Sequence, residues 1–209
     1  MSLGFRRKVK ADGRVPLVAG VDSSTQSTKA VLCRAALDEL SALALAAEPG
    51  AGGVTLLPYL DGERTPDRPD ATGVLAGLTT SNATRENVAR TAVEALLCSL
   101  ADAVGHLAAR GGVRPRRTLL IGGGARSAAV RALAPAILGT PVTVPEPAEY
   151  VALGAARQAA WALAGTPRPP AWPAPPATEH TGDGADAAEI RERYAALRDS
   201  APRIGGRTP

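Results

Sequence analysis

The most regular pattern of apolar and polar positions lies in residues 84–112. Small and apolar side chains recur there at steps of three and four residues, which is the spacing of one face of an α-helix. Thr84 is a suitable N-cap residue, and the pair Gly111-Gly112 supplies a C-terminal stop. We therefore predict one long helix whose core-facing stripe comprises Val88, Thr91, Ala92, Ala95, Leu96, Ser99, Leu100 and Ala103.

Shorter segments on both sides of this helix carry strand or helix patterns. Apolar runs bounded by Gly, Pro or polar residues predict strands, and runs rich in Ala and Leu predict helices. Pro58 interrupts one strand segment, and Pro135 is expected to kink or split one helix. A proline-rich segment is predicted to be a linker without a core. Strands are predicted at 16–22, 29–33, 54–60, 74–80, 119–121 and 141–146, helices at 34–49, 125–138, 148–165 and 185–200, and the linker at 166–184.

Composition limits how these segments can pack. The 209 residues suffice for one large domain, or for one ordinary domain with appendages. Hydrophobic residues make up 45% of the chain and aromatic residues only 3%, so the core must consist mainly of Ala, Leu and Val. The net charge of +4 comes from dispersed basic residues, apart from one N-terminal cluster, which we interpret as a solvated tail with nucleic-acid binding as the alternative. That cluster comprises Arg6, Arg7, Lys8 and Lys10.

The two cysteines, Cys33 and Cys98, carry no sign of metal or redox chemistry. They form no CxxC pair and have no histidine nearby, so we interpret them as small apolar residues in a reducing compartment. No apolar segment precedes Asp12 that would resemble a secretory signal, and charged residues and prolines interrupt the other apolar stretches. We expect a cytoplasmic protein that binds neither nucleic acid nor membrane.

The stretch LLIGGGARS, residues 119–127, is the strongest candidate for a binding site. A strand that leads through glycines into a helix brings bare backbone close to a ligand and directs helix N–H groups at it. The order also resembles the dinucleotide fingerprint, because Gly122 and Gly124 match its first half and Glu146 is an acid at a suitable distance. Ser127 occupies the third glycine position, which weakens that match. A tight strand-to-helix turn without a ligand remains the alternative.

A second candidate lies near the N-terminus, in the segment DSSTQSTK at residues 22–29. Asp22 ends a predicted strand, and hydroxyl side chains and Lys29 follow it. Backbone N–H groups and a cation in such a turn can surround phosphate, with the carboxylate directed toward a metal ion. The alternative is a hairpin turn that the Asp, Ser and Thr side chains stabilise.

Several segments together resemble the xylulokinases of the FGGY family of carbohydrate kinases. They are GVDSSTQSTKAVL, the long stretch from LLPYLDGERTP to VEALL, LLIGGGARS, and VTVPEPAEYVALGAARQAAWALAG, in the order in which the family has them. The resemblance covers residues 16–33 and 35–165, with a weaker match near Tyr194. It implies an α/β, actin-like (ribonuclease-H-like) fold, mainly the C-terminal half of the kinase. The domains would be a polar tail (1–15), an N-terminal-domain remnant (16–34), the C-terminal domain (35–165), the linker, and a terminal helix with its tail (185–209).

The resemblance also implies a reaction, in which the γ-phosphate of MgATP passes to a hydroxyl of D-xylulose and gives xylulose 5-phosphate and ADP. By position, Asp22 would face magnesium and phosphate. The other members of the phosphate loop would be Ser23, Ser24, Thr25, Gln26, Ser27 and Lys29. The residues that flank adenosine would be Gly122, Gly123, Gly124, Ala125 and Ser127.

One departure from the family pattern limits these implications. Residues 31–33 lead directly into the helix at 34–49, whereas the family places most of its N-terminal domain between these two segments. That region supplies the sugar-binding residues and the catalytic Asp, and a second phosphate turn follows it. We assign no catalytic residue and predict that this chain alone is inactive and able to self-associate through exposed apolar surface. The alternatives are a non-catalytic nucleotide-binding or interaction module and a gene remnant without function.

Overall fold

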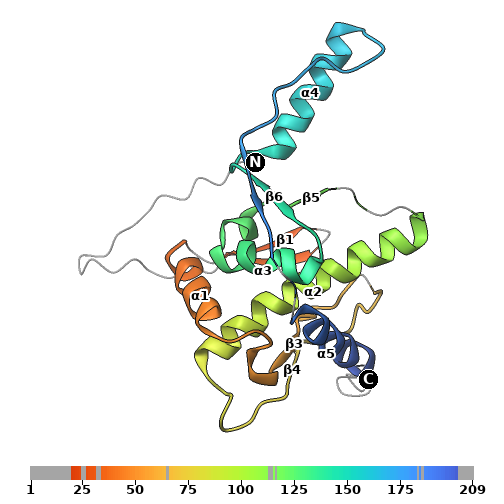
Figure 1. Cartoon of the computed structure of the whole chain (residues 1–209). Helices are drawn as coiled ribbons and strands as arrows, with labels where there is room; N and C mark the ends of the chain where they lie inside the picture. Colours follow the sequence, from red (N-terminus) through yellow and green to blue (C-terminus); the bar gives the residue numbers. More distant parts are fainter. Residues whose placement is uncertain are drawn as a thin grey trace.

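The computed structural model describes residues 20–24, 27–31, 34–64, 66–112, 115, 117–182, 184 and 186–201. Helices and short strands alternate along the chain, and three helices gather around the long helix α2, Arg85–Gly111, while α4, Tyr150–Ala164, projects from them (Figure 1). The polar tail and Cys33, the first of the two cysteines, lie outside the described residues.

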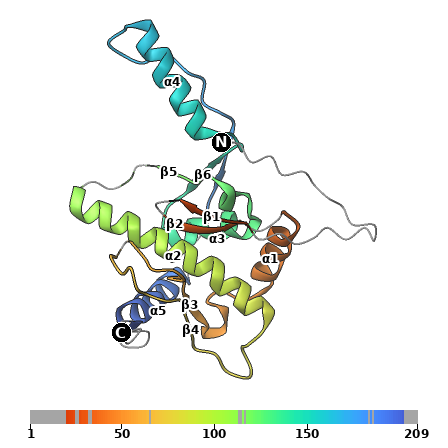
Figure 2. The ribbon, with the colours of Figure 1, turned by 180° about the vertical axis from the view of Figure 1, so that it is seen from behind.

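The core lies where α2 crosses the other helices. α1, Arg34–Ala46, and α3, Ala128–Leu138, both pack on α2 and on each other, and α5, Ala187–Ser200, contacts α2 and α3 from the other side. The view from behind shows α2 running across the whole body (Figure 2). The largest fully buried apolar side chains come from α2, α5, β3 (Thr55–Leu57) and β6 (Val142–Pro145) and from the residues on either side of β3, and the small residues between them allow the helices to approach closely. These large side chains are Tyr59, Tyr194, Leu57, Leu97, Val54, Val142 and Cys98.

The described residues form three small sheets. Strands β1, Gly20–Ser24, and β2, Ser27–Val31, form the antiparallel hairpin that the N-terminal pattern predicts. β3, Thr55–Leu57, pairs antiparallel with β4, Val74–Ala76. β5, Thr118–Leu119, pairs parallel with β6, Val142–Pro145, because α3 crosses over between them, and β7, Ala177–His180, pairs antiparallel with β6.

The limits of α2 confirm the prediction, but its buried face differs from the predicted stripe. The Thr84 hydroxyl accepts a hydrogen bond from the Asn87 N–H, and Gly112 ends the helix with φ 62°. Val88, Leu96 and Leu100 are exposed, whereas Arg90 and Glu94 are buried. The prediction failed in this respect because α1 ends against α2, and its end needs polar partners that periodicity alone does not reveal. By length and apolar composition α2 would also suffice to cross a membrane, and its N-terminal half is packed inside the core here.

α3 starts later than predicted and is not split. A short 3₁₀ helix, η2, takes up Gly123–Arg126, and α3 begins only after Ser127. Pro135 lies inside the continuous helix and is buried. Because proline has no N–H, it cannot donate the helical hydrogen bond to the carbonyl one turn earlier. Gly139 ends α3 in the left-handed conformation, φ 68°.

The predicted linker at 166–184 contains the strand β7, Ala177–His180, which the proline-rich pattern does not predict. The ATEH sequence of β7 has no apolar alternation, and its pairing comes from the free edge of β6. α5 belongs to the core, since Ile190, Tyr194 and Leu197 are buried. α4 has no buried residue at all, so its apolar pattern faces solvent.

Candidate functional site

The glycine turn joins the end of β5 to the start of α3, in the order that the sequence predicts. Gly122 has φ 95° and ψ −174°, a backbone conformation that residues with a Cβ atom rarely adopt. Gly123 and Gly124 are exposed, and a methyl group built at either position would meet no heavy atom within 4 Å. The fold itself therefore needs a glycine at position 122, and the next two glycines leave open space beside the backbone.

The exit of the turn is firmly anchored, in contrast to its exposed glycines. Ala125 is 7% exposed and Ser127 only 2%. The Ser127 hydroxyl accepts a hydrogen bond from the Val130 N–H at 3.2 Å and caps α3. The guanidinium of Arg131 donates to the carbonyl oxygens of Ala125, at 3.0 Å, and Arg126, at 2.8 Å. The turn thus consists of exposed glycines followed by residues that burial and hydrogen bonds hold in place.

The groups around the turn offer hydrogen-bond donors to a polar ligand, and the charge nearby is positive. The side chain of Arg126 lies on the exposed turn itself. The first turn of α3 adds the positive end of the helix dipole, and no acidic residue lies in that turn. Glu146, the acid that a dinucleotide site would use, is exposed beyond the end of β6, where its N–H donates to the Pro176 carbonyl. Backbone, dipole and Arg126 together offer donors and positive charge rather than an acid–base pair.

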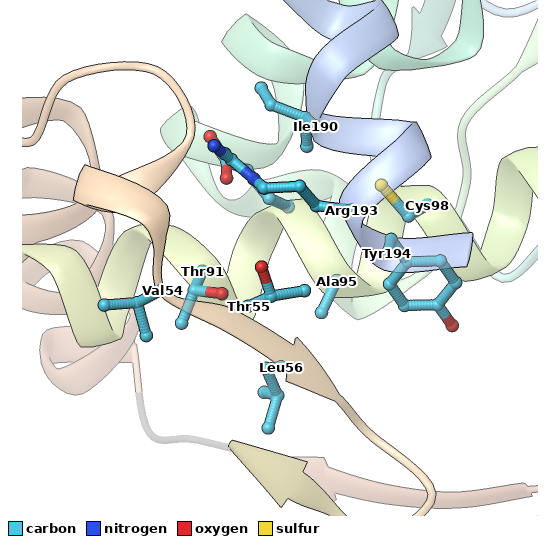
Figure 3. A pocket seen from close by; sticks show the side chains of 10 residues that line it. Val54, Thr55, Leu56, Thr91, Ala95, Cys98, Ile190, Arg193 and Tyr194 are labelled. Atoms are coloured by element: carbon cyan, nitrogen blue, oxygen red, sulfur yellow. The ribbon is translucent and has the colours of Figure 1, made fainter. Parts of the chain in front are cut away.

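Two cavities lie elsewhere in the described residues. The first holds about 10 Å³ between β3, α2 and α5, lined by side chains that include Thr91, Cys98 and Arg193 (Figure 3). The second holds about 210 Å³ on the projecting α4, beside Arg157 and Trp161. A pocket for a nucleotide-sized ligand measures about 300–1,000 Å³. The first cavity has room for a single water molecule, and neither cavity includes the glycine turn.

Cys98 borders the first cavity, and its surroundings disfavour nucleophilic chemistry. Burial, helped by the nearby carboxylates of Glu94 and Asp102, raises the pKa of the Cys98 thiol to about 12. The thiolate is the reactive form, so this thiol stays protonated and inert at neutral pH. This agrees with the interpretation of Cys98 as a small apolar core residue.

The predicted phosphate segment lies on the β1–β2 hairpin. Asp22 and Lys29 are register partners across the two strands, as are Ser23 and Thr28, and Ser24 and Ser27. The side chains of these strands, and Thr25 and Gln26 entirely, lie outside the described part of the structure. Within the described part, no group of three or more His, Cys, Asp or Glu side chains is placed to hold a metal ion. The roles of the hairpin residues in phosphate and magnesium binding therefore stay predictions.

Sequence reasoning missed two residues that build the base of the turn. Ser41 on α1 shares a hydrogen bond of 2.8 Å with Ser127, although 86 positions separate them in the chain. No local pattern in the sequence indicates this contact. Arg131 is different, because a basic residue one helical turn after a serine cap is a recognisable, though weak, sign of side-chain hydrogen bonds to the preceding turn.

Comparison with known proteins identifies the family. The family model for the C-terminal domain of the FGGY family of carbohydrate kinases matches residues 5–163. This chain belongs to the FGGY family of carbohydrate kinases. Its fold is accordingly the α/β, actin-like fold of that domain, as predicted. The matched region includes the β1–β2 hairpin, so the assignment of the hairpin to the other kinase domain stays a prediction.

Xylulose kinases are among its relatives in both sequence and structure. The chain is 37% identical to the xylulose kinase of Haemophilus influenzae over 153 residues, which is 72% of this chain and 31% of that protein. It is 42% identical to the xylulose kinase of Streptomyces rubiginosus over 137 residues, 64% of this chain and 28% of that protein. The solved xylulose kinase of Bifidobacterium adolescentis superposes with a TM-score of 0.67 at 54% identity, covering 79% of this chain and 33% of that one. The FGGY kinase chain described here thus spans about a third of the length of these relatives.

Proposed function

We propose that the glycine turn of this chain binds the adenosine part of ATP, in a nucleotide-binding unit of xylulokinase type. The observation that carries the proposal is the contrast within the turn: Gly123 and Gly124 lie exposed beside open space, while Ala125 and Ser127 are buried and held. An exposed backbone arc in a fixed position is what a flat ligand needs in order to approach closely. Membership of a kinase family supports a nucleotide as that ligand.

The phosphates of the nucleotide would extend toward the hairpin segment at 22–29 under this proposal. Asp22 is the carboxylate there, and its register partner Lys29 is the cation. Mg²⁺ is commonly held by one or two protein carboxylates together with substrate phosphates and water, so one aspartate beside hydroxyl-rich backbone is a fitting donor set. Bound magnesium would neutralise charge on the phosphates, and Asp22 would orient it.

The nominal substrate is D-xylulose, because xylulose kinases are prominent among the relatives. In the full reaction the xylulose hydroxyl oxygen bonds to the γ-phosphorus, its proton passes to a base, and ADP leaves. Phosphoryl transfer of this kind depends on several groups positioned together. We assign no residue of this chain as the base, and therefore propose that the 209-residue chain binds nucleotide without significant kinase activity by itself.

Calorimetry with ATP and magnesium tests the binding proposal. We expect saturable heat at micromolar to millimolar nucleotide, with the adenosine part sufficient for weaker binding. No binding of ATP at millimolar concentration would rule out the proposal, whereas binding of NAD in preference to ATP would favour the dinucleotide alternative. A coupled assay of ADP release tests the second part, and xylulose-dependent turnover at rates typical of kinases, about 1–100 per second, would contradict the predicted inactivity.

Self-association is a second proposal, which a specific observation favours. α4 has no buried residue, and Val151 and Leu163 on it are 89% and 91% exposed. Exposed apolar helix surface of this kind promotes association. Sedimentation velocity across a wide concentration range would detect it, and a monomer throughout would exclude it.

A further inference from the structure

The buried end of the glycine turn is connected to a helix that is remote in sequence. Ser127 lies directly after the turn, and Ser41 lies on α1; both side chains are buried, with 2% and 3% of their surface exposed. Their hydroxyl oxygens are 2.8 Å apart. A buried polar group needs a partner, so this contact ties the exit of the turn to α1.

The direction of the hydrogen bonds follows from the number of protons available. Each serine hydroxyl has one proton to donate and can accept further hydrogen bonds. Ser41 Oγ donates to the Leu37 carbonyl at 2.7 Å. The remaining proton, that of Ser127, therefore points to Ser41, while Ser127 Oγ accepts the Val130 N–H. A directed chain of hydrogen bonds runs from the first turn of α3 through both serines to the backbone of α1.

Arg131 holds the same segment through main-chain carbonyl groups. Its guanidinium donates to the carbonyls of Ala125 and Arg126, the last two residues of η2. In addition, the Ser127 N–H donates to the Gly124 carbonyl at 3.1 Å. Both peptide groups between Ala125 and Ser127 are therefore held by hydrogen bonds. These bonds restrict how far the exposed glycines before them can move.

We propose that Ser41 is a positioning residue for the nucleotide-binding turn. By accepting the Ser127 proton, it fixes the place and orientation of Ser127 relative to α1, and hence the position at which the N–H groups of Gly123 and Gly124 are presented. Ser41 touches no ligand in this scheme and acts only through Ser127. The effect of Ser41 on nucleotide binding rests on the proposed function. Its effect on the position of the turn does not depend on which ligand the turn binds.

Hydrogen exchange and nucleotide affinity, measured on the same variants of the full chain, test this role. In Ser41→Ala we expect faster exchange at the amides of Ala125, Ser127 and Val130, and an ATP dissociation constant raised by roughly tenfold, which corresponds to about 1.4 kcal/mol. Thr84→Ala is the matched control, because it removes a helix cap from α2, far along the chain from the turn. It should lower overall stability without selective exchange at residues 122–130 and without a change in affinity.

A second variant keeps the inference testable if Ser41→Ala does not fold. Ser41→Cys keeps nearly the same size and only weakens the hydrogen bond, so it should fold and show a smaller change in the same direction at the same amides. Unchanged exchange at these amides, or faster exchange with unchanged ATP affinity, would overturn the role of Ser41. If the unaltered chain binds no ATP, the proposed function fails, and the exchange data alone then decide whether Ser41 fixes the turn.

Discussion

Arg90 and Glu94, one helical turn apart on α2, form an ion pair that is almost completely buried. Arg90 Nε lies 2.6 Å from Glu94 Oε1, and the two side chains are 8% and 5% exposed. Glu94 also accepts the Gly50 N–H at 2.9 Å. Arg90 donates to the carbonyl oxygens of Ala44, in the last turn of α1, and Ala47, the residue that follows the helix. The pair thus supplies the polar partners for the end of α1 inside the core.

Substitution of Glu94 by Ala should lower the free energy of unfolding by about 3–5 kcal/mol, because it leaves the Arg90 charge buried without its partner. Urea unfolding at neutral pH measures this. Arg85→Ala is the control, since the Arg85–Glu39 pair is exposed, at 73% and 64%, and should contribute less than about 1 kcal/mol. An equal decrease in the free energy of unfolding in the two variants would show that burial does not make the Arg90–Glu94 pair more important for stability than the exposed pair.

The glycines of the turn should separate folding from binding. Gly123→Ala and Gly124→Ala should leave the unfolding midpoint nearly unchanged, because a methyl group meets no atom there, yet weaken ATP binding about tenfold by keeping the ligand away. Gly122→Ala should instead destabilise the chain by about 1 kcal/mol or more, because of its φ of 95°.

Gly105→Ala in α2 provides the control for these variants. The position also has open space, and the change should stabilise the helix by up to about 1 kcal/mol without any effect on ATP affinity. Calorimetry and thermal unfolding on the four variants give both quantities. Full ATP affinity in both Gly123→Ala and Gly124→Ala would remove the adenosine assignment.

Stability should fall as the pH rises above about 9. The Cys98 thiol ionises near 8.5 in the unfolded chain, but burial raises its pKa to about 12 in the fold. Between these values the unfolded state binds fewer protons, so each pH unit lowers the free energy of unfolding by up to about 1.4 kcal/mol. Burial raises the pKa of Tyr59 and Tyr194 as well, which adds to the loss at the upper end of this range.

Cys98→Ala tests the origin of this dependence. Urea midpoints between pH 7.5 and 10.5 should decline less steeply in the variant, although its cavity lowers stability at every pH. In a Cys33→Ser background, Cys98 should also resist thiol reagents until the chain is unfolded. Identical slopes with and without the thiol, or rapid labelling of the folded chain, would contradict the assignment.

α5 should be essential for stability, although it lies beyond the segment that matches the family model. Leu197 is 8% exposed and belongs to the hydrophobic core. Leu197→Ala should cost about 2–5 kcal/mol, as expected for a buried leucine. Leu107→Ala, at a position that is 74% exposed, should change stability by less than about 0.5 kcal/mol. A small loss in Leu197→Ala would mean that α5 is an appendage.

Local chemistry made part of the fold predictable. Thr84 and Gly112 mark the ends of α2 because a cap and a left-handed glycine act within one turn of the chain. The strand, glycine turn and helix around Gly122 follow from the same kind of short-range signal. The family resemblance, carried by several such segments in order, gave the fold class.

The parts that could not be predicted depend on distant segments. Glu94 is buried because Gly50, 44 positions earlier, needs an acceptor, and helical periodicity carries no trace of that need. β7 forms because β6 has a free edge, not because ATEH resembles a strand. The candidate site divides in the same way: its glycines are visible in the sequence, whereas the support from Ser41 appears only in three dimensions.

The end of β6 and the start of β7 lie side by side in the third sheet. Pro145, at the end of β6, and Ala177, at the start of β7, are register partners, so the whole of residues 146–176, with α4 in it, forms the connection of a β-hairpin. Such a connection can change in length and sequence while the two strands remain paired. Residues 166–169, which are exposed after α4, are therefore the natural position for inserting a reporter domain without disturbing the helices around α2.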